Sequence, residues 1–412
     1  MSDVGKADYF VDEDAATMLE YMRASEAERL TMRSLRIVII GAGIGGLTAA
    51  LALLRRGFRP VVYERAPVAR EIGAGVIIWP NARRALRDLE IDGALAAISS
   101  DVRTSYFCDY ATGSILDVRW GEQLIEKHGM GNLQVHRGDL HGLLLQAVLA
   151  NNAEAVHPGH QFIRLAQDGD GITVEFANGA RVPCDVVVGA DGNASAVRSY
   201  LFPGEAPVFT GQVSFRALIP WDVVPPAIAE RKYAMYPGPQ RMLLHYPLRG
   251  GRIMNLVANG RSASWEEEGW AIPAANEEFA AAYSDFAPEV VAMIRSIPAG
   301  SLFKWGLRDR EPLATWTKGR VTMLGDAAHP MTPFLGQGAC IAIEDGLVLG
   351  RAFELAGSIE EALARYEAAR KIRGTNVQLW SREQGRNLQA SRKGQTAIER
   401  GLLEYDPVTV PV

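Results

Sequence analysis

Two glycine-rich segments, each with an acidic residue nearby, are the parts of this 412-residue chain best suited to chemistry. In the first, Gly41 permits a tight turn, Gly43 lets a pyrophosphate approach the backbone, and Gly46 lets a helix pack close to a strand. A helix starting at Gly45 would offer N–H groups to the phosphates. Glu64 follows Gly46 by 18 residues, where a carboxylate can accept hydrogen bonds from ribose hydroxyls. The segment predicts a dinucleotide site for FAD or NAD, because Glu64 would repel the 2′-phosphate of NADP.

The second segment runs from Asp326 to Ala339. Asp326 follows an expected strand and can bind the hydroxyls of a cofactor's polyol chain. A helix expected to start at Gly338 turns its positive dipole end toward an anion, such as the N1–C2=O edge of a reduced flavin. Asp191 follows another expected strand and is placed like a further cofactor contact. Arg137, at the expected start of a helix, could pair with a phosphate or lie on the surface.

Alternating strands and helices must position these residues. An apolar, β-branched run at 37–40 predicts a buried strand, and a helical pattern and a second strand follow it. This β-α-β order predicts an α/β fold with a Rossmann-like domain at 35–202 and 306–380. Short β-like segments separated by prolines predict an inserted, sheet-rich substrate domain at 203–305. The chain would end in a helical tail at 381–412.

The composition limits the class of protein. A hydrophobic content of 48%, a charged content of 22% and a net charge of −5 are typical of globular proteins and give no support for nucleic-acid binding. Three widely spaced cysteines form neither a disulfide framework nor a metal motif, so we expect no metal and a cytoplasmic location. The acidic N-terminus argues against a leader peptide. The uncharged run 37–54 contains four glycines, so a membrane span is not expected.

Residues 1–34 precede the first expected strand as an N-terminal extension. Asp14 could cap a helix reaching Met32, with apolar residues on one side. We interpret it as an added surface helix that could form a subunit contact, as in a homodimer. Disorder is the alternative interpretation.

Six motifs in order resemble the single-component flavin-dependent aromatic hydroxylases, in particular the branch with salicylate, 3-hydroxybenzoate and 6-hydroxynicotinate hydroxylases. They are Gly41-Ala-Gly-Ile-Gly-Gly46, Glu64-Arg65, Gly73-Ala-Gly75, His136-Arg137-x-Asp-Leu140, Gly189-Ala-Asp-Gly192 and Gly325-Asp-Ala-Ala-His-Pro330. The resemblance covers roughly residues 36–380 and implies FAD in a glutathione-reductase-like domain. It also implies that NADH or NADPH reduces the flavin and that O2 then gives a C4a-hydroperoxide. This species would hydroxylate a small aromatic or N-heteroaromatic ring.

The resemblance implies cofactor-binding residues along the whole length of FAD. They are Glu64 and Arg65 at the adenosine, Arg137 at the pyrophosphate, Asp326 at the ribityl chain, Asp191 beside the flavin and the nicotinamide cofactor, and Gly338 with Ala339 near the isoalloxazine. The loop at Gly75 and Val76 has closely spaced glycines before an apolar run, so we expect it to lie close to a flat ligand.

The candidate catalytic residues are Tyr246 and His329. Tyr246 could hydrogen-bond a substrate hydroxyl or only pack in the core, and His329 could act in catalysis or only fix its loop. Arg216 could meet the flavin, a substrate carboxylate or a surface ion partner. We expect His245 to be structural, because neighbouring residues of a strand point to opposite faces. The expected pocket walls, which core packing would also explain, are Met242, Leu244, Pro333 and Phe334.

Where the related branch carries histidines, this chain has Met242, Phe334 and Ile77. We therefore expect a more apolar pocket. The sequence does not identify the base that would activate the substrate. The main prediction is an FAD-dependent monooxygenase. Three alternatives remain: a flavin epoxidase or ring oxidase of a bulkier nonphenolic substrate, a non-catalytic flavin-binding protein, and an NAD dehydrogenase without flavin. The substrate, the hydroxylated position, any decarboxylation and the choice between NADH and NADPH also stay open.

Overall fold

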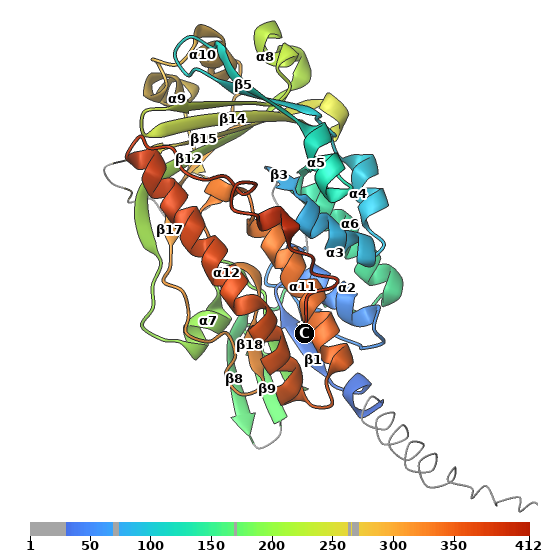
Figure 1. Cartoon of the computed structure of the whole chain (residues 1–412). Helices are drawn as coiled ribbons and strands as arrows, with labels where there is room; N and C mark the ends of the chain where they lie inside the picture. Colours follow the sequence, from blue (N-terminus) through green and yellow to red (C-terminus); the bar gives the residue numbers. More distant parts are fainter. Residues whose placement is uncertain (1–29, 69–73, 169–170, 263–264, 266–271) are drawn as a thin grey trace, which may run out of the picture.

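A five-stranded parallel sheet forms the centre of the lower half of the molecule in Figure 1. The structure is a computed structural model that describes residues 30–68, 74–168, 171–262, 265 and 272–412. The strand order is β18-β11-β1-β2-β7. The bounds are β1 (Ile37–Ile40), β2 (Val61–Tyr63), β7 (Val156–His157), β11 (Val186–Gly189) and β18 (Val321–Met323). Every residue of β1 and β11 is buried, as expected for parallel strands covered on both faces.

Two helices, α2 (Ile44–Leu54) and α11 (Gly338–Leu355), lie side by side against this sheet (Figure 1). Glycines let them approach closely: a Cβ on Gly346 would lie 2.7 Å from the Ala49 nitrogen, and one on Gly350 would lie 2.8 Å from the Ala52 Cβ. Because these contacts advance in the same direction along both helices, α2 and α11 run parallel and begin at the same edge of the sheet. The other helices of this unit are α3 (Pro80–Asp88), α4 (Asp92–Ile98), α5 (Gly121–His128), α6 (Arg137–Asn151), α7 (Ala196–Leu201) and α12 (Ile359–Gln389).

Two smaller antiparallel sheets adjoin the parallel sheet. One consists of β8 (Phe162–Asp168), β9 (Gly171–Phe176) and β10 (Arg181–Cys184), and the other pairs β3 (Gly75–Ile78) with β6 (Leu133–His136). The ring of Tyr63 in β2 lies 4.7 Å from the ring of Phe176 in β9, so the three-stranded sheet packs against the parallel one.

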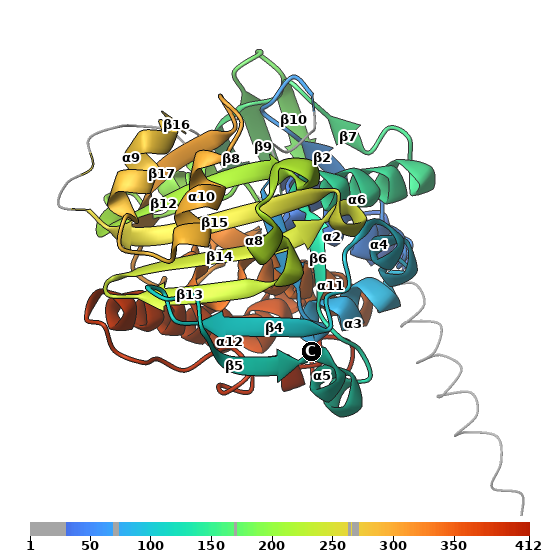
Figure 2. The same ribbon diagram turned by 90° about the horizontal axis from the view of Figure 1, so that it is seen from above.

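An eight-stranded sheet forms the upper half of the molecule in Figure 1, and Figure 2 shows it from above. Its order is β16-β17-β12-β15-β14-β13-β4-β5. The strands are β4 (Thr104–Cys108), β5 (Ile115–Trp120), β12 (Val208–Pro220), β13 (Ala234–Gly238), β14 (Arg241–Leu248), β15 (Ile253–Arg261), β16 (Ile272–Pro273) and β17 (Leu302–Asp309). Three helices cover its outer face (Figure 2): α8 (Pro226–Glu230), α9 (Asn276–Ala282) and α10 (Pro288–Arg295). Short 3₁₀ turns, η1 (Trp221–Val223) and η2 (Arg249–Gly251), join some of the strands.

The outer face of this sheet has a hydrophobic core of its own, which contains Leu243 of β14. His245 is also fully buried on this face, with its ring 5.9 Å from that of Tyr236. The intervening residues of β14, Leu244 and Tyr246 among them, therefore point to the inner face, toward α11 and α12. His245 therefore points away from Tyr246, as expected, and its structural role stays a prediction.

The expected domain organisation needs four corrections. β4 and β5 belong to the eight-stranded sheet, although the sequence placed residues 104–120 in the first domain. Local patterns revealed the strand pair but not its long-range parallel pairing with β13. β17 extends to Asp309, past the expected boundary at 305, and α12 crosses the expected boundary at 380 without a break. After Gln389, the expected helical tail contains only the 3₁₀ turn η5 (Leu402–Glu404).

The predicted N-terminal helix and its subunit contact fall almost entirely on residues 1–29, outside the described residues. Within the described ranges, no helix combines the length and the apolar composition that crossing a bilayer requires.

Candidate active site

The glycine turn after β1 leaves no room for a side chain at Gly41 or Gly46. Gly41 has a φ of +107°, and a Cβ there would lie 2.5 Å from the Ala190 oxygen. A Cβ on Gly46 would lie 2.0 Å from the Gly41 oxygen. No side chain caps α2, whose N-cap is Gly43. This bare helix N-terminus has the geometry of a phosphate site.

Two side chains hold Ala42 at the tip of this turn. Glu64 Oε2 accepts a hydrogen bond from the Ala42 N–H at 2.8 Å, and its Oε1 accepts one from the Ala66 N–H at 2.9 Å. His141 Nε2 donates to the Ala42 oxygen at 2.7 Å. Each carboxylate oxygen has two lone pairs, so Glu64 keeps acceptors for ribose hydroxyls. Arg65, beside it, is exposed. The sequence reasoning missed His141, whose only signal was a histidine within a largely apolar helix.

The chain around Asp326 lies against the glycine turn that follows β1. A Cβ on Gly45 would lie 2.7 Å from Leu324 Cδ1 and 3.3 Å from the Ala342 Cβ. Asp326 lies in the 3₁₀ turn η3 (Gly325–Ala327), directly after β18. α11 begins at Gly338 and Ala339 and, like α2, has no side-chain cap. The segments predicted to share one cofactor therefore meet at the carboxyl edge of the parallel sheet, where open α/β sheets bind ligands.

Asp191 caps a helix with its side chain. Its carboxylate accepts hydrogen bonds from Ser195 Oγ at 2.5 Å, the Ala196 N–H at 2.7 Å and the Val197 N–H at 3.1 Å, at the start of α7. Burial raises the pKa of Asp191, although these hydrogen bonds counteract it. The Asp191 backbone lies against the Gly41 turn. A cofactor contact from Asp191 stays a prediction, and the backbone is better placed for it than the side chain.

The ribbon of β3 and β6 joins this edge to the eight-stranded sheet. The Gly75 N–H donates to Asn255 Oδ1 at 2.7 Å, and a Cβ on Gly75 would lie 2.8 Å from the Tyr246 hydroxyl oxygen. The Arg137 N–H donates to the Ala74 oxygen at 3.0 Å, so the start of α6 is tied to the same loop. Val76 is partly exposed beside Gly75, and Gly73 lies outside the described residues. Asn255, fully buried in an apolar strand, was not predicted.

The inner face of the large sheet carries the candidate substrate residues. Tyr246 pairs with Asn255, Leu244 with Val257, and Met242 with Asn259 in the ladder between β14 and β15. Arg216 pairs with Val257 from the other side, on β12. The structure thus brings four predicted residues onto one surface: Arg216, Met242, Leu244 and Tyr246. Met242, Leu244 and Arg216 are partly exposed there, whereas Tyr246 is 3% exposed.

Tyr246 and Arg216 differ in how they could act. Burial raises the pKa of Tyr246, opposed by nearby Arg216, so the phenol stays protonated and can serve as a hydrogen-bond partner. Burial lowers the pKa of the Arg216 guanidinium. Arg216 Nε donates to Ser214 Oγ at 3.2 Å, and its Cζ lies 5.4 Å from the centre of the Trp305 ring. No carboxylate among the described residues pairs with Arg216.

Pro333 and Phe334 lie in the 3₁₀ turn η4 (Pro333–Leu335), just before α11. A Cβ on Gly385 of α12 would lie 2.7 Å from Phe334 Cε2, so the Phe334 ring packs on this helix. Gln212 of β12 donates to the Gly385 oxygen at 3.2 Å. The turn therefore reaches the large sheet by way of α12, and its role as a pocket wall stays a prediction.

His329 belongs to a buried ion network, and its side chain is almost completely shielded from solvent. It is 1% exposed, its Nε2 donates to Asp345 Oδ2 at 2.6 Å, and its ring lies 4.9 Å from that of Trp316. Asp345 Oδ2 also accepts the Gly325 N–H at 3.0 Å. This arrangement supports the structural interpretation, in which His329 fixes the Asp326 turn, over the catalytic one.

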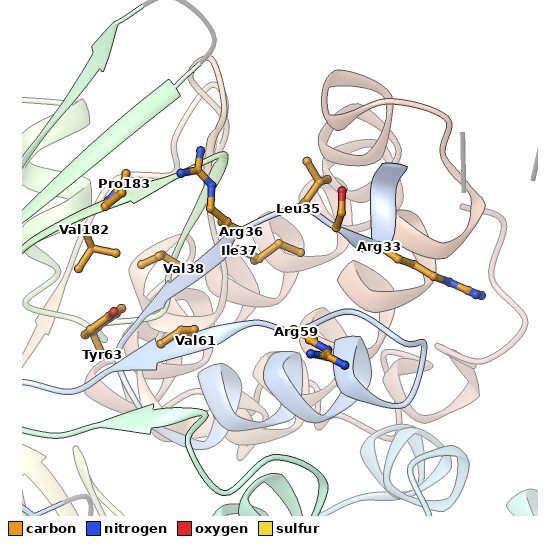
Figure 3. Close-up of a pocket in the computed structure, with 11 residues that line it drawn as sticks. Arg33, Leu35, Arg36, Ile37, Val38, Arg59, Val61, Tyr63, Val182 and Pro183 are labelled. Carbon is orange, nitrogen blue, oxygen red and sulfur yellow. The ribbon is translucent and has the colours of Figure 1, made fainter. Parts of the chain in front are cut away.

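Two surface hollows lie apart from this edge. The first, of about 440 Å³, is lined by residues 33–38, by Arg59, Val61 and Tyr63 at β2, and by Val182 and Pro183 of β10, as Figure 3 shows. It faces the three-stranded sheet and not the predicted cofactor. The second, of about 480 Å³, lies between the start of β12, the end of β15 and the end of α12, with Arg261 and Arg386 in its wall.

Known proteins match this chain along most of its length. The family model described as FAD binding domain matches residues 34–381. A 3-amino-4-hydroxybenzoate 2-monooxygenase of Streptomyces platensis is 36% identical, with 85% of this chain and 87% of the relative covered. A 6-hydroxynicotinate 3-monooxygenase of Pseudomonas fluorescens is 33% identical, with 84% and 90% covered. The crystal structure of Klebsiella pneumoniae HpxO complexed with FAD and uric acid is similar with a TM-score of 0.77 and 26% identity, covering 92% of this chain and 98% of that one.

Proposed function

The chain belongs to the FAD binding domain family, and we propose that it hydroxylates a small aromatic or N-heteroaromatic ring that carries a hydroxyl group and a carboxylate. The family match and the relatives confirm the predicted resemblance, the α/β fold class, the FAD-dependent monooxygenase function and FAD as the cofactor. NAD(P)H as the reductant, the carboxylate on the substrate, O2 as the oxidant and the individual residue roles are the parts proposed here.

The residues at the carboxyl edge fit FAD. The glycine turn has no space for a Cβ at Gly41 or Gly46, the α2 start is uncapped, and Glu64 lies beside that turn with free acceptor lone pairs. We assign the pyrophosphate to the α2 start and the adenosine ribose to Glu64. Asp326 would hold the ribityl chain, and the α11 start would face the isoalloxazine. When bound, FAD takes two electrons from NAD(P)H and activates O2 for transfer of one oxygen atom to the ring.

The position of Arg216 is the observation that supports a carboxylate on the substrate. Its guanidinium lies on the inner sheet face, without an acidic partner among the described residues, in the row formed by Leu244 and Val257. A desolvated guanidinium without a counter-charge is costly, and a planar carboxylate matches its two terminal nitrogens. The relatives named above act on a hydroxybenzoate and on a hydroxynicotinate, which both carry this group.

Tyr246 is proposed to orient the ring. Its hydroxyl lies near Gly75, where the β3–β6 pair meets the eight-stranded sheet. A protonated phenol there can donate to, or accept from, a substrate hydroxyl without acting as a base. Met242 and Leu244 on the same strand would exclude water from the ring, which favours oxygen transfer over loss of H2O2.

A panel of aromatic compounds tests this function. Purified protein reconstituted with FAD should consume O2 and NAD(P)H faster with hydroxybenzoates and hydroxynicotinates, and the product should gain the mass of one oxygen atom. The matched phenols and hydroxypyridines without the carboxylate should be much poorer substrates. If only bulkier nonphenolic compounds gain oxygen, the epoxidase alternative, which the apolar Met242 and Phe334 favour, replaces the proposal.

Three free, buried cysteines suit a reducing compartment such as the cytoplasm.

A further inference from the structure

The last residues of the chain cross back over the unit that holds the candidate cofactor edge, although they lie beyond the residues that the family model matches. In Figure 1, the chain turns back from the upper end of α12 and ends in front of α11. Leu403 is fully buried, and Leu402 joins a small core with Leu335 and Ile341 of the turn and helix beside the candidate flavin site. We call residues 402–412 the C-terminal strap.

Side chains of three helices hold the strap by its backbone carbonyls. Arg84 of α3 donates to the Leu403 oxygen at 2.7 Å and to the Tyr405 oxygen at 3.1 Å. Arg351 of α11 donates to the Pro407 and Val410 oxygens at 2.8 and 2.9 Å. On α12, Arg365 reaches the Val412 oxygen at 2.8 Å and Arg373 the Leu402 oxygen at 2.9 Å. This number of charge-assisted bonds shows that the strap has a defined path and is not a loose tail.

The Tyr405 ring lies over the two arginines at the centre of the buried ion network. The Cζ of Arg373 is 4.0 Å from the ring centre and that of Arg370 is 4.9 Å away. Both arginines lie on α12, and Arg370 is fully buried. The ring therefore covers one side of both guanidinium groups and contributes a cation–π interaction to each.

These arginines neutralise two adjacent carboxylates of α11. Arg373 binds Glu344 with two nitrogens, each at 2.7 Å, and Arg370 contacts Glu344 and Asp345, also at 2.7 Å. Burial alone would raise the pKa of both carboxyl groups. The arginines, together with His329 in the case of Asp345, outweigh it and hold both pKa values below their usual range. The pairs are therefore ionised, and their stability depends on excluding water from around them.

Each carboxylate positions a segment of the candidate flavin site. Asp345 accepts hydrogen bonds from the Gly325 N–H and from His329, which fixes the turn that carries Asp326. Glu344 accepts a hydrogen bond from Asn81 Nδ2 at 2.6 Å, and the same amide donates to Gln337 Oε1 at 3.0 Å. Gln337 is the N-cap of α11, so Glu344 fixes the helix start assigned to the isoalloxazine.

We propose that Tyr405 is a positioning residue for the flavin site, acting from the C-terminal strap through Arg370 and Arg373 on the carboxylates of Glu344 and Asp345. The strap closes the outer side of the network, and the network holds the Asp326 turn and the start of α11 in place. The proposal goes beyond the proposed hydroxylation. It requires only that FAD binds. The role of Tyr405 can therefore be refuted while the substrate assignment stands, and the substrate assignment can be refuted while the role of Tyr405 stands.

Tyr405→Leu, which removes the ring but keeps an apolar side chain, tests the proposal. We expect FAD affinity of the apoprotein, measured by quenching of flavin fluorescence, to fall on the order of tenfold, the size of a desolvated cation–π interaction. The midpoint potential of bound FAD should become more negative, because a displaced α11 start stabilises the anionic reduced flavin less. Tyr405→Phe keeps the ring and should retain both values.

Tyr283→Leu is the matched control, because Tyr283 likewise lies over an arginine, Arg241, but is buried on the outer side of the large sheet. It should lower the thermal stability of the apoprotein without changing FAD affinity or potential. The proposal is overturned if Tyr405→Leu changes these two quantities no more than Tyr283→Leu, or if Tyr405→Phe loses as much as Tyr405→Leu. Should Tyr405→Leu not fold, Arg84→Gln loosens the strap from outside and should shift both quantities in the same direction, and no shift would equally overturn the proposal.

Discussion

Replacing Arg216 by glutamine should remove the preference for substrates that carry a carboxylate. Nε of Arg216 is already bonded to Ser214, so the two terminal nitrogens are the donors left for a ligand. A hydrogen bond to a charged group contributes about 1.5–3 kcal/mol. Arg216 would make two such bonds to the substrate carboxylate, and a neutral glutamine amide would keep part of one. The expected loss of binding free energy is therefore about 3 kcal/mol. That corresponds to a decrease in kcat/KM of roughly a hundredfold.

The assay compares one acid and its decarboxylated analogue, chosen from the panel, in wild type and variant by O2 uptake. Arg216→Gln should lower kcat/KM for the acid roughly a hundredfold and leave the analogue within a few-fold. Arg241→Gln, on the outer face of β14 and paired with Asp285, is the control and should leave the ratio unchanged. An equal loss for acid and analogue would refute the reasoning, and would point to contact of Arg216 with the flavin, which a changed absorption spectrum of bound FAD would reveal.

Three further predictions follow from the site and the core. Tyr246→Phe should keep FAD bound but slow hydroxylation and raise the H2O2 formed per NAD(P)H, and unchanged coupling would make Tyr246 a packing residue. Glu64→Ala should weaken FAD binding on the order of tenfold or more, because it removes ribose acceptors and the Ala42 contact together, and full FAD occupancy after dialysis would contradict this. Burial lowers the pKa of His245 to about 3, so between its ordinary pKa near 6.5 and about 3 the unfolded chain binds a proton that the folded chain does not. Acidification through this window therefore costs stability, about 1.4 kcal/mol from this residue at pH 5.5, and His245→Leu should remove that part of the decrease measured by urea unfolding.

The sequence predicted the parts of the site whose signals are local. The glycine spacing after β1, Glu64 at the end of β2 and Asp326 after β18 each follow a short apolar strand. The rule that parallel strands end at one edge was enough to bring them together. The alternation of β14 likewise separated Tyr246 from His245 before the sheet was known.

The features that were missed or misassigned depend on contacts between distant residues. Asn255 bonds to Gly75 across 180 residues, and neither position shows its partner in the sequence. The β4–β5 hairpin was recognisable, but the sheet edge that it joins was not. His329 resembled a catalytic residue because it follows Asp326, and only its bond to Asp345, on the next helix, shows that its imidazole is already engaged.

Arg370 and Arg216 are both desolvated, but only Arg370 has carboxylate partners, which is why one is a structural residue and the other a candidate ligand site. Arg370 has carboxylates of Glu344 and Asp345 at 2.7 Å, and removing a partner from such a buried pair costs about 3–5 kcal/mol. Arg216 has no such partner among the described residues, so the folded protein bears part of its desolvation cost, reduced by the exposure that Arg216 retains. Residues that cost stability and lie in a binding surface are retained where function requires them. The same Arg216→Gln variant should therefore unfold at a higher temperature than wild type in the absence of ligands, while it loses activity toward acids. A lower unfolding temperature would mean that Arg216 stabilises the sheet itself, and the carboxylate assignment would lose its main support.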